Sequence, residues 1–420
     1  MRIGLAGYGR IGQAVLTTID RERGRLAAMG LALEGAAALV RDPARARPNA
    51  VSVRLVTDRR DLFGQDLDVL VEVLGGIEPA RTLVTHALQH GIPVVTANKS
   101  LVAAHGGELR ALAAEQRTPL LFEAAVVAGV PFLGALSRRP LFSSISSLLG
   151  VVNGTTHVVT SAIARGERFD DALQHAVACG YAEPDSDADV SGRDAAEKLA
   201  VLLQLAGCRG VAVADLPRLG IEWLTPAHFA GARACGGTIK PIVWASLDEA
   251  NRGAWIGPAF VAADHPIANI SGVTNALQFQ GSHGRASLFI GPGAGPEVTA
   301  ATIVDDIVEA VRAYDLGSRF AGMQGGSDLR GRVLTEWCST PPRTSSFLCV
   351  APAGRLRLQD VAELLAAYRV PARQIVERDG MLAARLAEAP WASVIEAVAQ
   401  LNGRGVHAMA LPALFPERRW

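Results

Sequence analysis

The feature that most constrains the fold is a glycine-rich turn near the start of the chain. Residues 3–6 form a short apolar run, a Gly-x-Gly-x-x-Gly turn follows, and residues 13–16 favour a helix. Between a strand and a helix, this spacing gives a tight turn at Gly7, close approach of a phosphate at Gly9 and close packing at Gly12. The phosphates then lie at the helix N-terminus. We therefore predict a Rossmann-type dinucleotide-binding domain whose cofactor contacts include Gly7, Tyr8, Gly9, Arg10, Ile11 and Gly12.

Apolar runs that alternate with helical segments follow this turn. They span residues 36–40, 68–74, 93–96 and 119–122. Alternation of this kind predicts a parallel sheet. Ligands of such sheets lie beyond the carboxyl ends of the strands, so Gly75 and Lys99 should border the cofactor. Taken alone, Lys99 could equally be a surface lysine that follows a strand.

The end of the second strand bears on the choice of cofactor. An acidic residue there binds the ribose of NAD, whereas an arginine suits the 2′-phosphate of NADP. The sequence has Arg41 at this point, with Arg45 and Arg47 close behind, and Asp42 beside it. NADP is the predicted cofactor, and Asp42 leaves NAD possible.

A second informative stretch, residues 179–199, joins an acidic loop to a helix. Asp194 and Lys198 are four residues apart, which places them on one face of that helix. An exposed ion pair is the simplest interpretation, because such pairs contribute little to stability. However, the surrounding residues 195–203 are almost entirely apolar. A partly buried lysine with a catalytic role is therefore the alternative.

The acidic loop also resembles a calcium-binding loop, since aspartates occupy every second position from Asp185 to Asp189. A calcium loop that starts at Asp185 requires Gly at its sixth position and Glu at its twelfth. The sequence has Val190 and Ala196 at these positions. The pattern therefore excludes this type of calcium site.

Composition excludes several classes of partner. Lys plus Arg and Asp plus Glu are equal at 41 each, which gives no electrostatic case for nucleic acid. The five cysteines are scattered, which argues against a disulfide framework or a zinc site and favours a reducing compartment. No apolar run reaches the ~18 residues of a membrane span. We expect a cytoplasmic protein without nucleic-acid or membrane partners.

Seven motifs, in one order along the chain, resemble those of homoserine dehydrogenases. They are the glycine turn, Ala97-Asn98-Lys99, Phe122-Glu123-Ala124 with Gly129-Val130-Pro131, and the segments at 150–156, 180–185, 194–199 and 291–295. The resemblance implies NAD(P)-dependent interconversion of L-homoserine and L-aspartate 4-semialdehyde. It also implies a place in amino-acid biosynthesis, towards threonine and methionine.

The resemblance also implies roles for individual residues. Lys198 matches the proton-donating lysine and Asp194 the acid on the same helix. Lys99 matches a second lysine beside the nicotinamide and the substrate oxygen. Glu183, with Asp189 close by, matches the acid that receives the substrate amino group. Gly295 matches a glycine of a late loop that meets the cofactor.

A monovalent cation site, for Na⁺ or K⁺, is implied as well. Its ligands would be Glu123 and the backbone carbonyls of Val126, Ala128 and Val130. The chain departs from the family pattern at three positions, which are Ser100, Val127 and His157. None of these removes a proposed catalytic group, so the departures bear on the cation site and on kinetics rather than on the reaction.

Residues 133–330 are predicted to form an α+β substrate-binding and dimerisation domain, with a helix at about 298–316 that returns to the first domain. Asn153-Gly154 within it could also mark a hairpin turn. Lys240 could be a third active-site lysine, although no motif surrounds it and a structural role is favoured. His265, before a proline, is interpreted as a loop residue.

A linker at 341–346 predicts a third domain over residues 341–420. The expected order of its elements, β-α-β-β-α-β, is ferredoxin-like and resembles the ACT module of many homoserine dehydrogenases. Residues 351–354 are a degenerate version of that module's first turn. A structural or dimerising role and feedback inhibition by threonine are equally compatible with it. The expected assembly is a homodimer or homotetramer.

Two rival functions stay open at this point. One is a related dehydrogenase for another small amino-acid aldehyde, because Glu183 and Asp189 favour an amino-acid substrate without fixing its length. The other is a non-catalytic, nucleotide-responsive regulator. Loss of Lys99 or Lys198 would have favoured the regulator, and both lysines are present.

Overall fold

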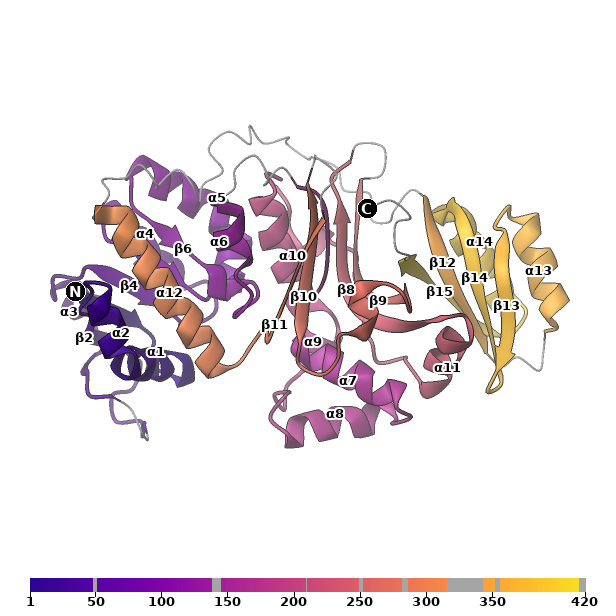
Figure 1. Ribbon diagram of the computed structural model, residues 1–420, viewed down its shortest axis with the longest axis horizontal. Helices are drawn as coiled ribbons and strands as arrows, with labels where there is room; N and C mark the ends of the chain where they lie inside the picture. Colours follow the sequence, from indigo (N-terminus) through magenta and orange to yellow (C-terminus); the bar gives the residue numbers. More distant parts are fainter. Residues whose placement is uncertain are drawn as a thin grey trace. The chain divides into compact units, whose positions relative to one another are not determined.

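The computed structural model describes residues 1–47, 51–137, 145–208, 210–248, 252–281, 286–315, 343–351 and 356–414 (Figure 1). The chain divides into two compact units. Unit 1 comprises Met1–Ser144, Glu197–Val213 and Gly291–Thr335, and unit 2 comprises Ile145–Ala196, Ala214–Ile290 and Glu336–Trp420. One boundary falls within helix α10 (Arg193–Leu205). The domain limits predicted at 330 and 341 lie outside the described residues.

Unit 1 contains, within its described residues, a six-stranded sheet in the order β3-β2-β1-β4-β5-β6. The strands are β1 (Arg2–Ala6), β2 (Glu34–Leu39), β3 (Arg54–Val56), β4 (Val69–Glu72), β5 (Val94–Thr96) and β6 (Leu120–Leu121). Every pairing is parallel. This order defines the doubly wound dinucleotide-binding fold, whose ligand lies where the order reverses, between β1 and β4. The predicted Rossmann-type domain is confirmed, with β3 as an additional short edge strand.

Helices from distant parts of the chain accompany this sheet, and several of them pack on it. They are α1 (Arg10–Arg21), α2 (Arg23–Ala28), α3 (Arg59–Phe63), α4 (Ala80–Gln89), α5 (Lys99–Glu115), α6 (Phe132–Ser137) and α12 (Pro296–Asp315). Helices α12 and α1 pack against each other (Figure 1). Ile303 and Ile307 of α12 share a buried apolar cluster with Val15 and Ile19 of α1. The predicted late helix therefore packs against the first α/β segment of the chain.

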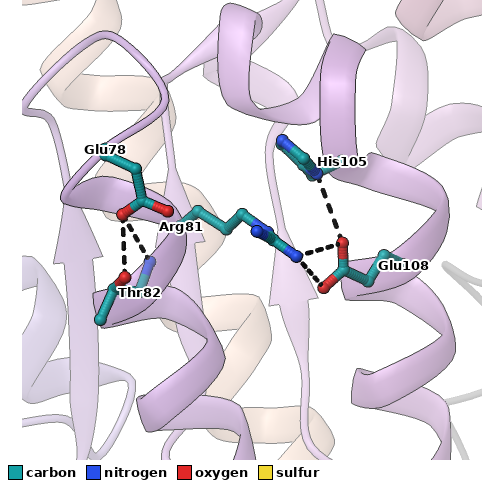
Figure 2. Close-up of polar contacts among 5 residues, drawn as sticks. All are labelled: Glu78, Arg81, Thr82, His105 and Glu108. Atoms are coloured by element: carbon teal, nitrogen blue, oxygen red, sulfur yellow. Dashed lines mark hydrogen bonds and ion pairs between the residues drawn. The ribbon is translucent and has the colours of Figure 1, made fainter.

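A polar network on the surface of unit 1 ties α4 to α5 (Figure 2). Arg81 of α4 donates to both carboxylate oxygens of Glu108 on α5, at 2.8 and 3.0 Å. His105 lies 3.3 Å from the same carboxylate, and Glu78 accepts from the Thr82 hydroxyl at 2.8 Å. Because α5 begins at Lys99, these contacts help to fix the helix that carries this lysine.

Unit 2 is built on a mixed sheet with the order β11-β10-β7-β8-β9-β15-β12-β14-β13 in its described part. Its first strands are β7 (Ile145–Val151), β8 (Gly237–Ser246), β9 (Gly253–Ala262), β10 (Asn275–Gly281) and β11 (Ala286–Gly291). Helices α7 (Gly154–Ala164), α8 (Phe169–Ala178), α9 (Asp187–Val190) and α11 (Pro226–Ala234) accompany them. This mixed sheet with its helices agrees with the α+β class predicted for this part of the chain.

The C-terminal part of unit 2 has the predicted β-α-β-β-α-β order. Its elements are β12 (Arg343–Ala351), α13 (Leu358–Ala367), β13 (Ala372–Arg378), β14 (Met381–Pro390), α14 (Trp391–Gly403) and β15 (His407–Leu414). Neighbouring strands are antiparallel, as in ferredoxin-like folds. Strand β12 begins at Arg343, so the second part of the predicted linker is strand. Residues 352–354 of the predicted first turn lie outside the described residues.

Strand β12 of this C-terminal sheet is buried on both faces. Along β12, Phe347 and Cys349 join a cluster with residues of α11 and β9, whereas Leu348 and Val350 join a cluster with residues of α13 and α14. The Phe347 ring stacks on Phe260 of β9 at a centroid distance of 5.0 Å. Strand β15 also pairs in parallel with β9. The C-terminal sheet is therefore continuous with the rest of unit 2.

Candidate active site

The glycine turn has the geometry of a phosphate-binding loop. Gly7 has a φ of +108°, and a Cβ there would lie 2.9 Å from the Val73 carbonyl oxygen. A Cβ at Gly12 would lie 2.4 Å from the Gly7 carbonyl oxygen. Gly9 is the N-cap of α1, and a Cβ there would meet nothing within 4 Å. The turn thus needs glycine for its own packing and leaves open space at a helix N-terminus, which fits a pyrophosphate.

The other predicted residues of this loop differ in exposure. Arg10 is exposed, and Ile11 is partly buried. The Tyr8 side chain is buried, its hydroxyl donates to the Val51 carbonyl at 2.5 Å, and burial raises its pKa. Because the Tyr8 ring packs inside unit 1, only its backbone is available to a ligand.

The loop after β2 is organised by its own polar groups. Arg41 and Asp42 are exposed. The Asp42 carboxylate accepts from the Ala44 amide at 2.8 Å. Arg47 donates to the Asp42 carbonyl at 2.8 Å and to the Tyr8 carbonyl at 3.3 Å. Arg47 therefore joins the loop after β2 to the glycine turn.

A fully buried carboxylate, Glu72, organises the carboxyl ends of β4 and β5. It accepts from the Leu74 amide at 2.8 Å and from the Thr96 hydroxyl at 2.6 Å. It also accepts from the Asn98 amide group at 3.3 Å. Burial raises the pKa of Glu72, and these donors partly offset the increase. Sequence reasoning missed this residue, although a single acid within the apolar run 68–74 was a usable signal.

Asn98, which donates to Glu72, also forms hydrogen bonds with the neighbouring loop and helix. Its side-chain oxygen accepts from the Leu101 amide at 3.1 Å, which caps α5. Its amide group also donates to the Gly76 carbonyl at 2.6 Å. The predicted cofactor residues Gly75 and Lys99 are thus brought to one edge of the sheet, on either side of one polar network.

The second half of α10 packs against α5 within unit 1. The Ser100 hydroxyl donates to Glu197 at 3.0 Å, and Gln204 donates to the Ala103 carbonyl at 2.7 Å. These bonds explain why residues 197–213, predicted in the second domain, belong to unit 1. Ser100 follows Lys99 and Glu197 precedes Lys198, so the bond joins the neighbours of the two predicted catalytic lysines. Both lysines are partly buried.

The predicted cation loop is anchored on α12. Both carboxylate oxygens of Glu123 accept backbone N–H groups of α6, from Leu133 and Gly134 at 2.7 Å each. The Glu123 amide donates to the buried Asp306 carboxylate at 3.1 Å. Burial raises the pKa of Glu123 to about 6 and that of Asp306 well above its usual range. Both Glu123 carboxylate oxygens are therefore used in capping helix α6.

Two other members of that loop are placed by backbone contacts. Ala128 forms an isolated antiparallel bridge with Gly293. Gly129 has a φ of +73° and donates to the Thr302 hydroxyl at 3.0 Å. Val126 and Val130 are buried. Two residues beyond the bridge, Gly295 is exposed with a φ of +119°.

In unit 2, Asn153 links the two predicted aspartates. Its amide group donates to Asp189 and to Asp194, at 2.7 Å in both cases. Its side-chain oxygen accepts from the Thr156 amide at 2.8 Å. Asn153-Gly154 is therefore a helix N-cap rather than a hairpin turn.

A small pocket of about 20 Å³ lies beside these residues within unit 2. Asn153, Thr156 and Asp189 contribute its polar wall, and most other lining residues are apolar. The adjoining loop is held by the Thr155 hydroxyl, which donates to the Tyr181 carbonyl at 2.9 Å. That loop carries the exposed Glu183. The predicted substrate residues Asp189 and Glu183 thus lie in the wall of this pocket and in the loop beside it.

The Lys240 side chain is buried within unit 2 and hydrogen-bonded there. Its ammonium group lies 3.3 Å from His157 Nε2 and donates to the Ile270 carbonyl. Burial lowers the pKa of Lys240 to about 8, and burial together with Lys240 lowers that of His157 to about 4. This geometry supports the structural alternative for Lys240. His265 accepts from the Ile267 amide at 3.2 Å and caps a short helix, as expected of a loop residue.

Comparison with known proteins decides the family. The family model for the homoserine dehydrogenase NAD-binding domain matches residues 7–123, and the homoserine dehydrogenase model matches residues 131–308. The Mycobacterium leprae homoserine dehydrogenase is 39% identical over 326 residues, which cover 76% of this chain and 74% of that protein. The Bacillus subtilis homoserine dehydrogenase is 33% identical over 334 residues, which cover 77% of this chain and 76% of that protein. This chain belongs to the homoserine dehydrogenase family.

Solved structures of the family agree in fold. A homoserine dehydrogenase from Thiobacillus denitrificans has a TM-score of 0.85 at 29% identity and covers 99% of this chain and 98% of its own. A hyperthermophilic archaeal homoserine dehydrogenase in complex with NADPH has a TM-score of 0.62 at 25% identity. The match covers 74% of this chain and 98% of that protein. Like its family, this chain is an NAD(P)-dependent oxidoreductase that acts on a CH–OH group of a small molecule, in amino-acid biosynthesis.

Two negative findings accompany this assignment. Within the described residues, no group of three or more His, Cys, Asp or Glu side chains could hold a metal ion. In the same residues, no helix is long and apolar enough to cross a membrane.

Proposed function

We propose that this homoserine dehydrogenase uses Lys198 as its proton donor, with Asp194 on the same helix and Lys99 as a second lysine at the reacting oxygen. The observation that carries this proposal is the packing of α5 against the second half of α10, through Ser100 and Glu197. It supports a common site for the two lysines, because each is the chain neighbour of one bonded residue.

The proposed reaction depends on the charge that develops on the substrate oxygen. A bound nicotinamide dinucleotide supplies or accepts hydride at C4 of its ring. When the aldehyde of L-aspartate 4-semialdehyde is reduced, negative charge develops on its oxygen. A lysine ammonium group can stabilise that charge and donate the proton that completes L-homoserine. Glu183 and Asp189 supply carboxylates for the substrate ammonium group.

NADP is the proposed cofactor. Arg41 is exposed at the end of β2, where the ribose phosphate of NADP would lie. The Asp42 carboxylate instead accepts from the Ala44 amide within its own loop. This use of Asp42 weakens the case for its binding the ribose of NAD. The glycine turn and Gly75, Lys99 and Gly295 complete the proposed cofactor contacts.

Further parts of the proposal concern regulation and assembly. Na⁺ or K⁺ is proposed at the carbonyls of Val126, Ala128 and Val130, beside Glu123. The ferredoxin-like C-terminal module is proposed to be ACT-like and to bind L-threonine or to support a homodimer or homotetramer. A cytoplasmic location is proposed, in keeping with the free thiols of the four cysteines in the described residues.

The test is the initial rate of absorbance change at 340 nm with L-homoserine. NADP⁺ is compared with NAD⁺, each with and without L-threonine and with Na⁺ or K⁺. Turnover with a preference for NADP⁺ supports the reaction and the role of Arg41. Folded protein that shows no turnover with either cofactor would favour the related-substrate or regulator alternatives.

The role of Lys198 is tested by substitution. Lys198→Ala should lower kcat by about a thousandfold, because a positioned proton donor contributes on this scale. NADPH binding, measured by fluorescence, should stay nearly intact. Lys198→Arg is the matched variant, since it keeps the positive charge but cannot release a proton. An Arg variant with wild-type activity would refute proton donation by Lys198.

A further inference from the structure

We infer that Asn153 is a positioning residue that holds Asp189 and Asp194 in place with a single amide group. The inference rests on the proposed function, because it assigns Asn153 to the same substrate site. Asn153 lies between β7 and α7, outside the acidic stretch at 179–199. Its contacts to that stretch span 36 and 41 residues.

The hydrogen bonds of Asn153 occupy its full capacity. An asparagine side chain offers two N–H donors and one oxygen with two lone pairs. One N–H donates to Asp189 Oδ1 and the other to Asp194 Oδ2, both at 2.7 Å. The oxygen accepts from the Thr156 amide at 2.8 Å and from the Thr156 hydroxyl at 3.0 Å. With 6% of its surface exposed, Asn153 has a single satisfied orientation.

Capping alone does not explain the choice of asparagine here. Ser, Asp and Asn are about equally favoured as N-caps, because each offers an oxygen to the first helical turn. Among these, only Asn also carries N–H donors. The two donors of Asn153 are both directed to carboxylates, which a residue that only caps a helix would not require.

A donor between the two aspartates offsets the repulsion of their charges. Like charges that share a site disfavour one another's ionised form, and hydrogen bonds to a carboxylate favour it. Asp194 is buried, with 8% of its surface exposed, and Asp189 is partly exposed. By donating to both, Asn153 holds the two carboxylates at a fixed separation. That arrangement suits a site that receives the ammonium group of an amino-acid substrate.

The substitution Asn153→Ser separates capping from positioning. Serine keeps the cap oxygen and removes both N–H donors, and its single, shorter O–H can donate to at most one of the two carboxylates. We expect the Tm to fall by a few degrees, because the buried Asp194 carboxylate loses a donor. The KM for L-homoserine should rise by about tenfold to a hundredfold, the usual cost of losing a hydrogen bond to a charged group. The Kd for NADPH should change by less than about twofold, because the affected groups belong to the substrate side.

Two further variants make the test specific. Asn153→Asp keeps the cap but adds a third carboxylate, so the acidic limb of the pH profile of kcat/KM for L-homoserine should move to higher pH. In a double-mutant cycle, Asn153→Ser and Asp189→Ala should be strongly non-additive, because one acts through the other. Additive losses would overturn the inference.

Two further outcomes would overturn the inference, and one would overturn the proposed function. An Asn153→Ser variant with a wild-type homoserine KM would overturn the positioning role. Equal losses of stability, NADPH binding and homoserine binding would mark Asn153 as a structural cap and overturn it too. If the wild-type protein bound NADPH but never turned over L-homoserine, the proposed function itself would fail, and the inference with it.

Discussion

Two asparagines, one in each unit, cap a helix and bind carboxylates at the same time. Asn98 caps α5 in unit 1 and donates to Glu72, and Asn153 caps α7 in unit 2 and donates to Asp189 and Asp194. In both cases the side-chain oxygen accepts a backbone N–H three residues on. The same local chemistry therefore fixes the start of a helix and the place of an acidic group.

The two sites differ in what their carboxylates can still reach. Glu72 is fully buried and its donors come from Leu74, Thr96 and Asn98, all within unit 1. Asp189 keeps part of its surface exposed and borders a pocket. A fully enclosed carboxylate can only organise the protein, whereas a partly exposed one can also bind a ligand. The comparison predicts a structural acid in unit 1 and a substrate-binding acid in unit 2.

The largest expected effect is the loss of Glu72. Glu72→Ala leaves the Leu74 amide, the Thr96 hydroxyl and the Asn98 amide group without their buried acceptor. Leaving buried donors unsatisfied costs about 1–3 kcal/mol for each group, so unit 1 should lose at least about 3 kcal/mol of stability. Urea unfolding followed by hydrogen exchange in segments of unit 1 measures this loss.

The matched variant for unit 2 is Asp189→Ala. It should cost much less stability, because Asp189 is partly exposed, but it should strongly raise the KM for L-homoserine. Glu72→Ala should instead weaken NADPH binding, through the loop at Gly75 and Gly76. If Glu72→Ala left unit 1 as stable as wild type, the structural role of the enclosed acid would be wrong.

The next prediction is an opposite response of the two units to acid. His157 has a pKa lowered to about 4 from 6.5 by burial and by Lys240. The stability linked to its neutral form is complete above pH 6.5 and is lost as pH falls towards 4. Glu123 has a pKa raised by burial to about 6 from 4.5, so its contribution is complete below pH 4.5 and is lost as pH rises through 6.

Lowering the pH from about 7 to about 5 should therefore weaken unit 2 by about 2 kcal/mol through His157 alone and strengthen unit 1 through Glu123. Hydrogen exchange at the two pH values reports each unit separately. His157→Asn, which removes the titrating ring, is the control and should remove the His157 part of the acid sensitivity of unit 2. The part due to His228, whose pKa burial also lowers to about 4, should remain. Parallel loss of protection in both units would contradict this contrast.

Local patterns allowed much of the fold to be predicted. The glycine turn, the strand ends at Gly75 and Lys99, and the β-α-β-β-α-β order all depend on residues close together in sequence. The parallel pairing of β15 with β9 was not predictable in this way, because it involves only Ala413 with Phe260 and Leu414 with Val261. Two residue pairs leave no periodicity in the sequence.

The residues of the candidate site were likewise predictable from local motifs but not from long-range contacts. Asp194, Lys198 and Lys99 were found because they lie in motifs. Asn153 lies in a motif too, but its role depends on carboxylates 36 and 41 residues away. Such a contact is set by the fold and not by local spacing. Glu72 differs, because an acid inside an apolar strand is by itself a sign of a buried, hydrogen-bonded carboxylate.

The smallest expected effect concerns the bond between the neighbours of the two lysines. Ser100→Ala removes the donor to Glu197 and should cost about 1 kcal/mol of stability, the net value of a typical hydrogen bond. If the bond also aligns α5 with α10, kcat should fall severalfold while the KM for L-homoserine and the Kd for NADPH stay nearly constant. Ser100→Thr, which keeps the hydroxyl, should restore kcat. An alanine variant with unchanged kcat would limit Ser100 to packing, and the alignment of the two lysines would then depend on the Gln204 contact with Ala103.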